Sequence, residues 1–194
     1  MNDMEDFLNG ITTALDAGEI DVAEAAQRTV RYVQRQIGCD VVACWVLQGE
    51  PPARSAKRIA CADVDDPDAH LKPMVLDQAQ CADYLELIAT GGLFMSADAQ
   101  EDPFLAAMRD VYLIPCGIRA TMCVTIAVNG ESTSVISCSQ RSATRVWTAA
   151  EVAKMQRLAA QISLRRARRS ARERMAASMD EQMASGLMPL NSGR

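Results

Sequence analysis

The residues best suited to binding chemistry lie on one side of a predicted strand, residues 118–126. Side chains alternate along a strand, so one side carries groups that can hydrogen-bond, namely Arg119, Thr121, Cys123 and Thr125. The other side is apolar, with Ile118, Ala120, Met122, Val124 and Ile126. A guanidinium binds a carboxylate or an oxyanion through two parallel hydrogen bonds. We therefore expect the mixed side to face a small-molecule pocket and the apolar side to pack against helices.

Aromatic side chains are scarce, at 4% of residues, so a cluster of them around one site would be informative. The candidates for a pocket wall are Trp45, Phe94, Phe104 and Tyr112. Two alternatives remain open. These rings can be ordinary core residues, and Arg119 can pair with Asp98 or Asp102, or face water, instead of binding a ligand.

Thiol and metal chemistry receive less support from the sequence. Seven cysteines form no Cys-x-x-Cys pair, and His70 is the only histidine. We therefore expect no zinc site. We expect the thiols to be free and to behave as small hydrophobic groups in a reducing compartment. A reactive thiol needs nearby positive charge, and only Cys116 has an evident basic neighbour, Arg119. The acids at 63–68 lack the spacing of a calcium loop, so we expect a solvated acidic loop.

Bulk properties limit the possible partners. The chain has 194 residues and a net charge of −5, which disfavours general nucleic-acid binding. The apolar run at 41–47 is too short to span a bilayer, which argues against a membrane protein. The acidic residues at the N-terminus do not resemble a signal or transit peptide. We expect a cytoplasmic protein.

The predicted elements that position these residues alternate between helices and strands. Apolar periodicity predicts helices at 4–15 and 22–37, strands at 39–47 and 55–62, a helix at 77–90, a strand at 93–95 and a helix from 103. Two β-rich runs then flank Asn129-Gly130, a dipeptide typical of tight hairpins. Thr148 and Glu151 form a capping box that predicts the start of a long helix. This order indicates an α+β fold with an antiparallel sheet.

The arrangement resembles the GAF domain family, whose members are small-molecule-sensing and dimerisation modules. The resemblance rests on Asp98-x-x-x-Asp102-Pro103, on Gly117-Ile118-Arg119 at the entry to a strand, and on Trp147-Thr148-x-x-Glu151. It implies a sheet of five to six strands with terminal helices on one face and inserted helices over a ligand pocket on the other. It also places a ligand-facing or structural acid at Asp98. We divide the chain into an N-terminal helix (1–20), a GAF-like domain (21–164) and a basic helical extension with a tail (165–194).

The terminal helices have opposite charge. Residues 1–30 hold seven acids and one arginine, and residues 151–194 hold nine basic and four acidic residues. A continuous helix from 148 to 185 would reach about 55 Å, longer than a domain of this size. We expect a homodimer that forms a helical bundle through Phe7, Ile11, Val152, Met155, Ala159 and Ile162. A solvated arginine face without a partner is the alternative.

The resemblance implies a sensor that binds an unknown small molecule and signals in trans, through its terminal helices, to a separate enzyme such as a histidine kinase. We expect no cofactor, because tetrapyrrole-binding members attach their chromophore to a cysteine beside a histidine, and His70 has no such neighbour. Two alternatives stay open. One is a thiol-dependent enzyme of the free methionine sulfoxide reductase type, although the local cysteine motifs differ. The other is a pure dimerisation scaffold whose pocket is filled by large side chains.

Overall fold

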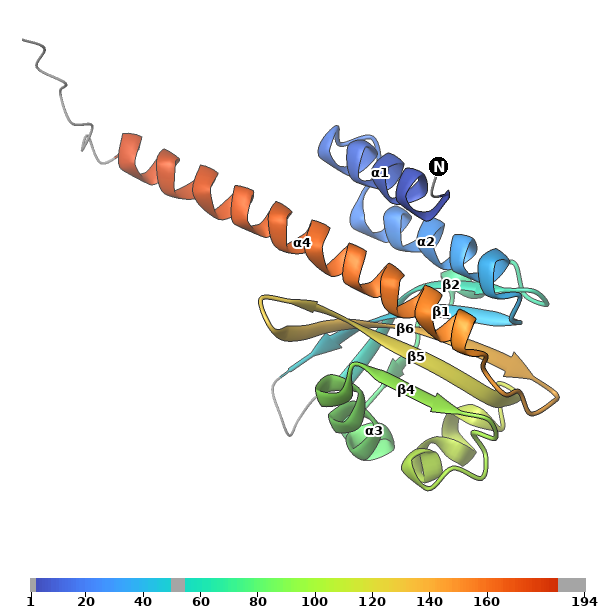
Figure 1. Cartoon of the computed structure of the whole chain (residues 1–194). Helices are drawn as coiled ribbons and strands as arrows, with labels where there is room; N and C mark the ends of the chain where they lie inside the picture. The colour runs from blue at the N-terminus through green and yellow to red at the C-terminus, as the bar shows by residue number, and fades with distance from the viewer. Residues whose placement is uncertain (1–2, 50–54, 185–194) are drawn as a thin grey trace, which may run out of the picture.

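The computed structural model of the chain describes residues 3–49 and 55–184 (Figure 1). Six strands form one antiparallel sheet in the order β3-β2-β1-β6-β5-β4. Their bounds are β1 Val41–Gln48, β2 Ser55–Asp63, β3 Val75–Leu76, β4 Leu93–Ser96, β5 Ile118–Val128 and β6 Glu131–Arg141. The predicted antiparallel α+β fold is confirmed.

Strands β5 and β6 form a hairpin within the sheet, and its turn forms where the sequence predicts it. Asn129 and Gly130 both have positive φ, at 55° and 84°. This geometry matches the right-handed twist of the two strands, because both turn residues adopt the left-handed region. Each strand is 11 residues long. The hairpin therefore contributes the strand that carries the predicted pocket residues.

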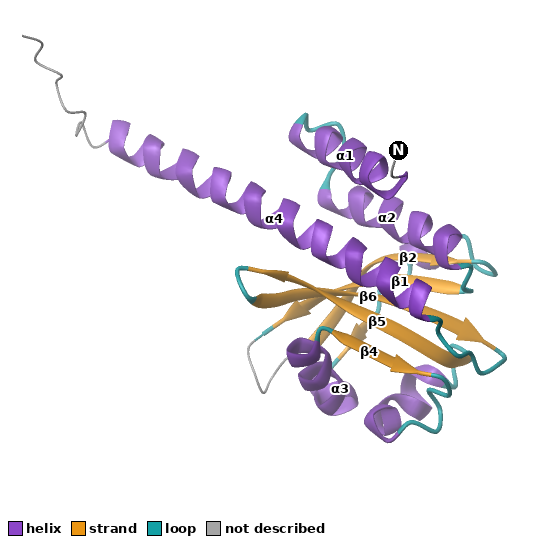
Figure 2. Ribbon diagram, viewed as in Figure 1, coloured by secondary structure: helices purple, strands orange, loops and turns teal. Residues whose placement is uncertain are grey.

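Three helices, α1 (Asp3–Asp16), α2 (Val22–Ile37) and α4 (Ala149–Ala184), cover one side of the sheet, which we call the terminal-helix face (Figure 2). The capping box at the start of α4 is confirmed. The Thr148 backbone N–H donates to Glu151 Oε2 at 2.7 Å, and the Glu151 N–H donates to Thr148 Oγ1 at 3.3 Å. The helix then runs for 36 residues, about 54 Å, and extends well beyond the sheet. Residues 185–194, where we predicted the end of the helix and a tail, lie outside the described residues.

The other side, which we call the insert face, is covered by α3 (Gln78–Gly91), η2 (Pro103–Met108) and η3 (Arg109–Leu113). The structure corrects the single helix predicted from residue 103. A 3₁₀ segment is followed by a π-helical turn. The wider π turn allows the neighbouring residues Tyr112 and Leu113 both to be buried against the sheet. In α3, Cys81 has non-helical dihedral angles and produces a kink.

Two apolar cores lie on opposite faces of the sheet. The alternation in β5 divides its residues between them: Met122 and Val124 pack under the terminal helices, and Cys123 packs under the insert. The prediction for Ile118 is wrong, because its side chain packs on the insert face and not on the terminal-helix face. The pairing of β5 with β6 shifts register between Ile118 and Ala120, and this irregularity inverts the alternation at that end.

Among residues 3–49 and 55–184, no helix combines the length and the apolar character needed to cross a bilayer.

Candidate functional site

The predicted pocket between the sheet and the insert is almost completely filled. Its cavity measures about 30 Å³. Ligand pockets usually measure roughly 300–1,000 Å³, so this space holds little more than a water molecule. The lining comes from β1, β2, β3, β5, β6, α3, η2 and η3: Trp45, Ala56, Leu76, Tyr84, Leu85, Leu105, Met108, Tyr112, Leu113, Ile118, Thr121, Cys123, Val135, Ser137 and Ser139.

Large aromatic side chains take up this space. Trp45 reaches across from β1, and its indole N–H donates to Ser137 Oγ at 3.0 Å. The ring of Tyr112 meets Trp45 edge-on, with 5.8 Å between centroids. Tyr84 from α3 makes a similar edge contact with Phe94 at 5.6 Å. Burial raises the pKa of both tyrosines, which therefore act as neutral parts of the core.

The structure brings together half of the predicted ligand-binding residues. Trp45, Tyr112, Thr121 and Cys123 line the small cavity. Phe94 belongs to the same core and contacts Tyr84, but it does not line the cavity. Phe104 does not join these residues, contrary to the prediction, because its side chain is 53% exposed and does not line the cavity. The 3₁₀ conformation that starts at Pro103 places it on the outer side of η2.

Arg119 and Asp98 bind each other outside the cavity lining. Arg119 Nη2 donates to Asp98 Oδ2 at 2.6 Å, and Nη1 contacts Gln100 Oε1 at 3.5 Å. This is the ion pair that we kept open as the alternative to a ligand contact. Asp98 Oδ1 and Arg119 Nε are buried and find no hydrogen-bond partner within the described chain, so the pair is not bidentate. Arg119 therefore holds the loop after β4 against β5.

The thiols near the cavity are poorly suited to nucleophilic chemistry. Burial raises the pKa of Cys123 and of Cys116, so both are protonated at neutral pH. Cys39 differs, because a hydrogen bond from Cys138 lowers its pKa, but its side chain is buried on the terminal-helix face. All seven cysteines lie in the described ranges and are free. Within those ranges, no cluster of His, Cys, Asp or Glu has the geometry to hold a metal ion.

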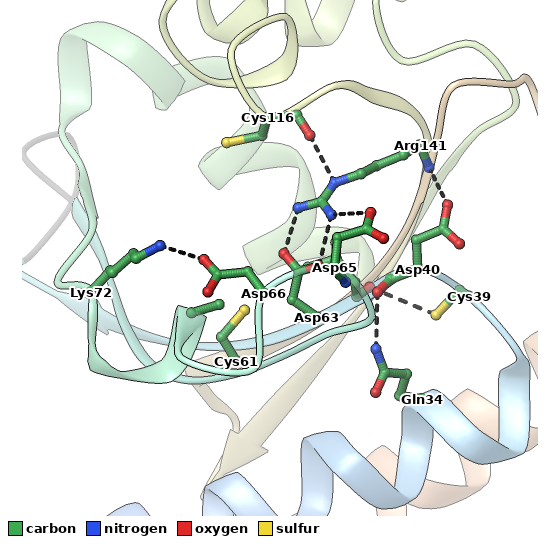
Figure 3. Close-up of polar contacts among 12 residues, drawn as sticks. Gln34, Cys39, Asp40, Cys61, Asp63, Asp65, Asp66, Lys72, Cys116 and Arg141 are labelled. Carbon is green, nitrogen blue, oxygen red and sulfur yellow. Dashed lines mark hydrogen bonds and ion pairs between the residues drawn. The ribbon is translucent and has the colours of Figure 1, made fainter.

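A polar cluster that the sequence analysis missed closes one end of the insert face (Figure 3). Arg141, at the end of β6, donates to Asp63 at 2.7 and 2.5 Å and to Asp65 at 3.0 Å. Its Nε also donates to the Cys116 carbonyl at 3.0 Å. The acidic loop is therefore not simply solvated, since Asp63 is buried and paired. The strand order explains why these residues meet. Strand β1 is antiparallel to both β2 and β6, so the C-terminal ends of β2 and β6 lie at the same end of the sheet.

On the terminal-helix face, a groove of about 460 Å³ lies between α1, α2 and α4, with β1, β2, β5 and β6 as its floor. We call it the helix groove. Its lining residues are Leu8, Ile11, Thr12, Leu15, Val22, Ala25, Ala26, Thr29, Cys44, Val46, Ile59, Ile126, Val128, Thr133, Ser134, Ile136, Ile162, Arg165, Arg166, Arg169, Ser170 and Glu173. This groove is roughly fifteen times larger than the cavity on the insert face.

Of the six residues predicted to form a dimer interface, two are buried within a single chain and four are only partly buried. Met155 and Ala159 are buried against the sheet, and Val152 packs against the same core. Phe7 stacks on Tyr32 at 4.1 Å between ring centroids. Ile11 and Ile162 line the helix groove instead. Packing of α4 on the sheet therefore buries the middle of its heptad stripe, at Met155 and Ala159.

Solved structures with a similar fold include GAF domains and a chromophore-binding domain. The phycocyanobilin-bound GAF domain of a cyanobacterial phytochrome is 17% identical, with 87% of this chain and 96% of that chain covered and a TM-score of 0.67. The blue-light absorbing form of the Thermosynechococcus elongatus PixJ GAF domain is 16% identical, with 90% and 95% covered and a TM-score of 0.68. The chromophore-binding domain of Stigmatella aurantiaca bacteriophytochrome is 17% identical, with 84% of this chain and 60% of that chain covered and a TM-score of 0.59.

The insert-face cavity does not fit a chromophore such as phycocyanobilin. A cavity of about 30 Å³ is far below the space that a tetrapyrrole needs. His70 lies outside the lining, where its Nδ1 is 2.9 Å from the Pro67 carbonyl oxygen. The residues present therefore give no place for a tetrapyrrole on this face.

A comparison with family models shows which family the chain represents. No curated protein matches the chain. The model of the GAF domain matches residues 21–165, about three quarters of the chain. The sheet order, the helices on both faces and the similar solved structures all agree with this match. This chain belongs to the GAF domain family.

Proposed function

We propose that this chain is a sensory module that pairs with a second copy through the distal part of α4, residues 171–184, and signals in trans to a separate enzyme such as a histidine kinase. The observation that carries the proposal is a stripe of exposed methionines. Met175, Met179 and Met183 are 67%, 60% and 54% exposed and recur every four residues, on one side of a helix that extends beyond the sheet.

The distal part of α4 has no other element of the described chain packed on its methionine stripe. Most helical stability in proteins comes from packing of an apolar face, and a free helical end of this length is only marginally stable in water. A contiguous exposed apolar stripe marks an interaction surface. Methionine side chains are flexible and polarisable, which suits them to a helix–helix contact. Pairing along this stripe would supply the packing that a single chain lacks there.

Sensing would act through the elements that hold α4 in place. Arg145 donates to the carbonyl oxygens of Ile37 and Gly38 at the end of α2, at 3.0 and 2.9 Å, and to Glu151 Oε1 at the start of α4, at 2.6 Å. A ligand that binds one packing arrangement better than another shifts the population towards it. A small change in domain packing would thus alter the position of α4 and, with it, the geometry of the paired helices. Function in the cytoplasm is part of this proposal, and the seven free thiols support it.

The experiment is sedimentation equilibrium of the full chain and of Met175→Glu/Met179→Glu/Met183→Glu. We expect a dimer for the natural sequence and a monomer for the variant, because three charges would lie in the contact. The matched control is Met95→Glu, which changes an exposed methionine on β4. A monomeric natural chain, or an equal effect of the control, would overturn the proposal.

The filled cavity favours a second candidate function, a pairing scaffold with no small-molecule input. In that case no ligand would alter the dimer or the unfolding temperature of the chain. The reductase alternative gains no comparable support, because Cys116 and Cys123 are protonated thiols. Turnover of free methionine sulfoxide that is lost in Cys123→Ser would revive it.

A further inference from the structure

We infer that the helix groove binds a single-chain anionic amphiphile, namely a free carboxylate with an alkyl tail. This goes beyond the proposed function and does not depend on it. The groove volume of about 460 Å³ lies within the range of small-molecule sites. Its walls are largely apolar, from Leu8, Ile11 and Leu15 on α1 to Ile126 and Ile136 on the sheet.

Small side chains create this open space. Ala25, Ala26 and Thr29 face the groove from α2, and Cys44 and Ser134 face it from the sheet. Burial raises the pKa of Cys44 to about 12, so this thiol is a neutral part of the apolar floor. An alkyl chain laid along such a surface would be stabilised in proportion to the apolar area that it removes from water.

One wall of the groove is positively charged and only partly neutralised. Arg166 Nη1 donates to the Ser134 hydroxyl at 2.6 Å. Arg165 donates to Gln161 Oε1 at 2.6 Å and to Asn9 Oδ1 at 2.8 Å. In the part of the chain that the structure describes, these two guanidiniums have only neutral hydrogen-bond partners. Arg169, the third arginine of the groove, pairs with Glu173 at 2.8 Å.

This combination identifies the chemistry of the ligand. Two guanidiniums with neutral partners attract an anion and can form charge-assisted hydrogen bonds with a carboxylate. The adjoining apolar walls select a tail over a small inorganic anion. A polar anion would leave the walls hydrated, and a neutral hydrocarbon would leave the arginines without a counter-charge. An alkyl carboxylate would match both the arginines and the apolar walls of the groove.

Charge also argues against α4 of a second copy as the occupant. That helix carries six arginines between residues 165 and 174, and it would bring them close to the three arginines of this wall. Like charges placed together in a partly buried groove oppose binding. The exposed methionines of the proposed pairing surface lie beyond the groove, which ends at Glu173 on α4.

The test is isothermal titration calorimetry of the full chain with sodium dodecanoate below its micelle concentration. Acetate supplies the head group alone, and dodecyltrimethylammonium supplies the tail with the opposite charge. The key variant is Arg165→Gln/Arg166→Gln. The matched control, Arg157→Gln/Arg168→Gln, removes the same charge from α4 at exposed positions outside the groove. Circular dichroism checks that each variant is folded.

We expect dodecanoate to bind and the other two compounds to bind far more weakly. The groove variant should weaken dodecanoate binding by about tenfold or more, the usual effect of losing hydrogen bonds to a charged group, and the control should not. Three results would overturn the proposal: no heat with dodecanoate, equal affinity for the cationic amphiphile, or equal losses in both variants. Dissociation of a dimer by the groove variant with unchanged dodecanoate binding would also overturn it, since the groove would then be a pairing surface.

Discussion

The two faces of the sheet share their strands but differ in how fully they are packed. On the insert face, Trp45, Tyr84 and Tyr112 meet in the centre and leave about 30 Å³. On the terminal-helix face, Ala26 and Thr29 oppose Ser134 and leave about 460 Å³. Strand alternation decides which face a residue joins, and side-chain volume decides whether that face closes. The family's usual place for a ligand is thus the more tightly packed of the two.

The sharpest way to test this difference is a matched pair of leucine truncations. Leu113→Ala removes a fully buried side chain from the insert face, and Leu15→Ala removes a half-buried one from the wall of the helix groove. We expect a loss of about 4 kcal/mol in the free energy of unfolding for Leu113→Ala, because a cavity remains in a closed core. Leu15→Ala should cost about 1 kcal/mol. Urea unfolding measures both, and equal losses would contradict the comparison.

The Arg141 cluster closes one end of the insert face, and its removal should be the next largest effect. Arg141→Met leaves the buried Asp63 carboxylate without its partner, and we expect a loss of about 3 kcal/mol. The double variant Arg141→Met/Asp63→Asn should recover part of this loss, because no buried charge then remains unpaired. If Arg141→Met alone is neutral, the cluster does not hold the two strand ends together.

Enlarging one alanine on each face should give changes of opposite sign. Ala56→Leu adds volume to the filled cavity and should destabilise the protein by about 1–2 kcal/mol through overpacking. Ala26→Leu adds the same volume to the helix groove and should stabilise the protein by about 1 kcal/mol. Thermal unfolding of the two variants checks the signs. Destabilisation by Ala26→Leu would mean that the groove is less open than described.

The smallest expected effect concerns the start of α4, which forms one wall of the groove. Burial opposes the charge of Glu151, but hydrogen bonds from Thr148 and Arg145 outweigh it, and the pKa of Glu151 is lowered. A carboxylate with a lowered pKa in the folded state stabilises the protein above its unfolded pKa of about 4.3. This contribution disappears as the pH falls through the lowered value. Glu151→Gln should therefore cost about 1 kcal/mol at neutral pH and nothing in stronger acid.

Unfolding of Glu151→Gln and the natural chain should be compared across this pH range. A difference that grows towards acid would contradict the assignment of Glu151 as the cap. Thr13→Ala is a suitable control, because it changes an exposed position on a different helix.

Local signals explain which parts of the fold could be predicted from the sequence. Asn129-Gly130 predicts its turn because both residues tolerate positive φ, and Thr148 with Glu151 predicts a helix start because four residues suffice to form the box. Ile118 was misplaced because the register shift at the start of β5 depends on pairing with β6. Phe104 was misplaced because a 3₁₀ segment replaces the expected α-helix.

The candidate sites were harder to predict, since they depend on volumes summed over distant elements. Strand alternation predicts the cavity side for Thr121 and Cys123, and the scarcity of aromatic residues makes Trp45 and Tyr112 candidates for its wall. The structure brings these four residues to one cavity, but no local pattern in the sequence shows that the rings fill it. The helix groove joins residues from α1 to α4 and has no local motif. Met155 and Ala159 follow a heptad that fits a partner helix as well as the sheet of the same chain.

The difference in packing predicts that a small molecule binds on the terminal-helix face and not on the insert face. Methyl NMR of the isoleucines during titration with dodecanoate tests it most directly. The account predicts chemical-shift changes at Ile11, Ile126 and Ile162, which line the helix groove, and none at Ile88 or Ile118, which lie in the opposite core. Changes confined to Ile88 and Ile118 would contradict it.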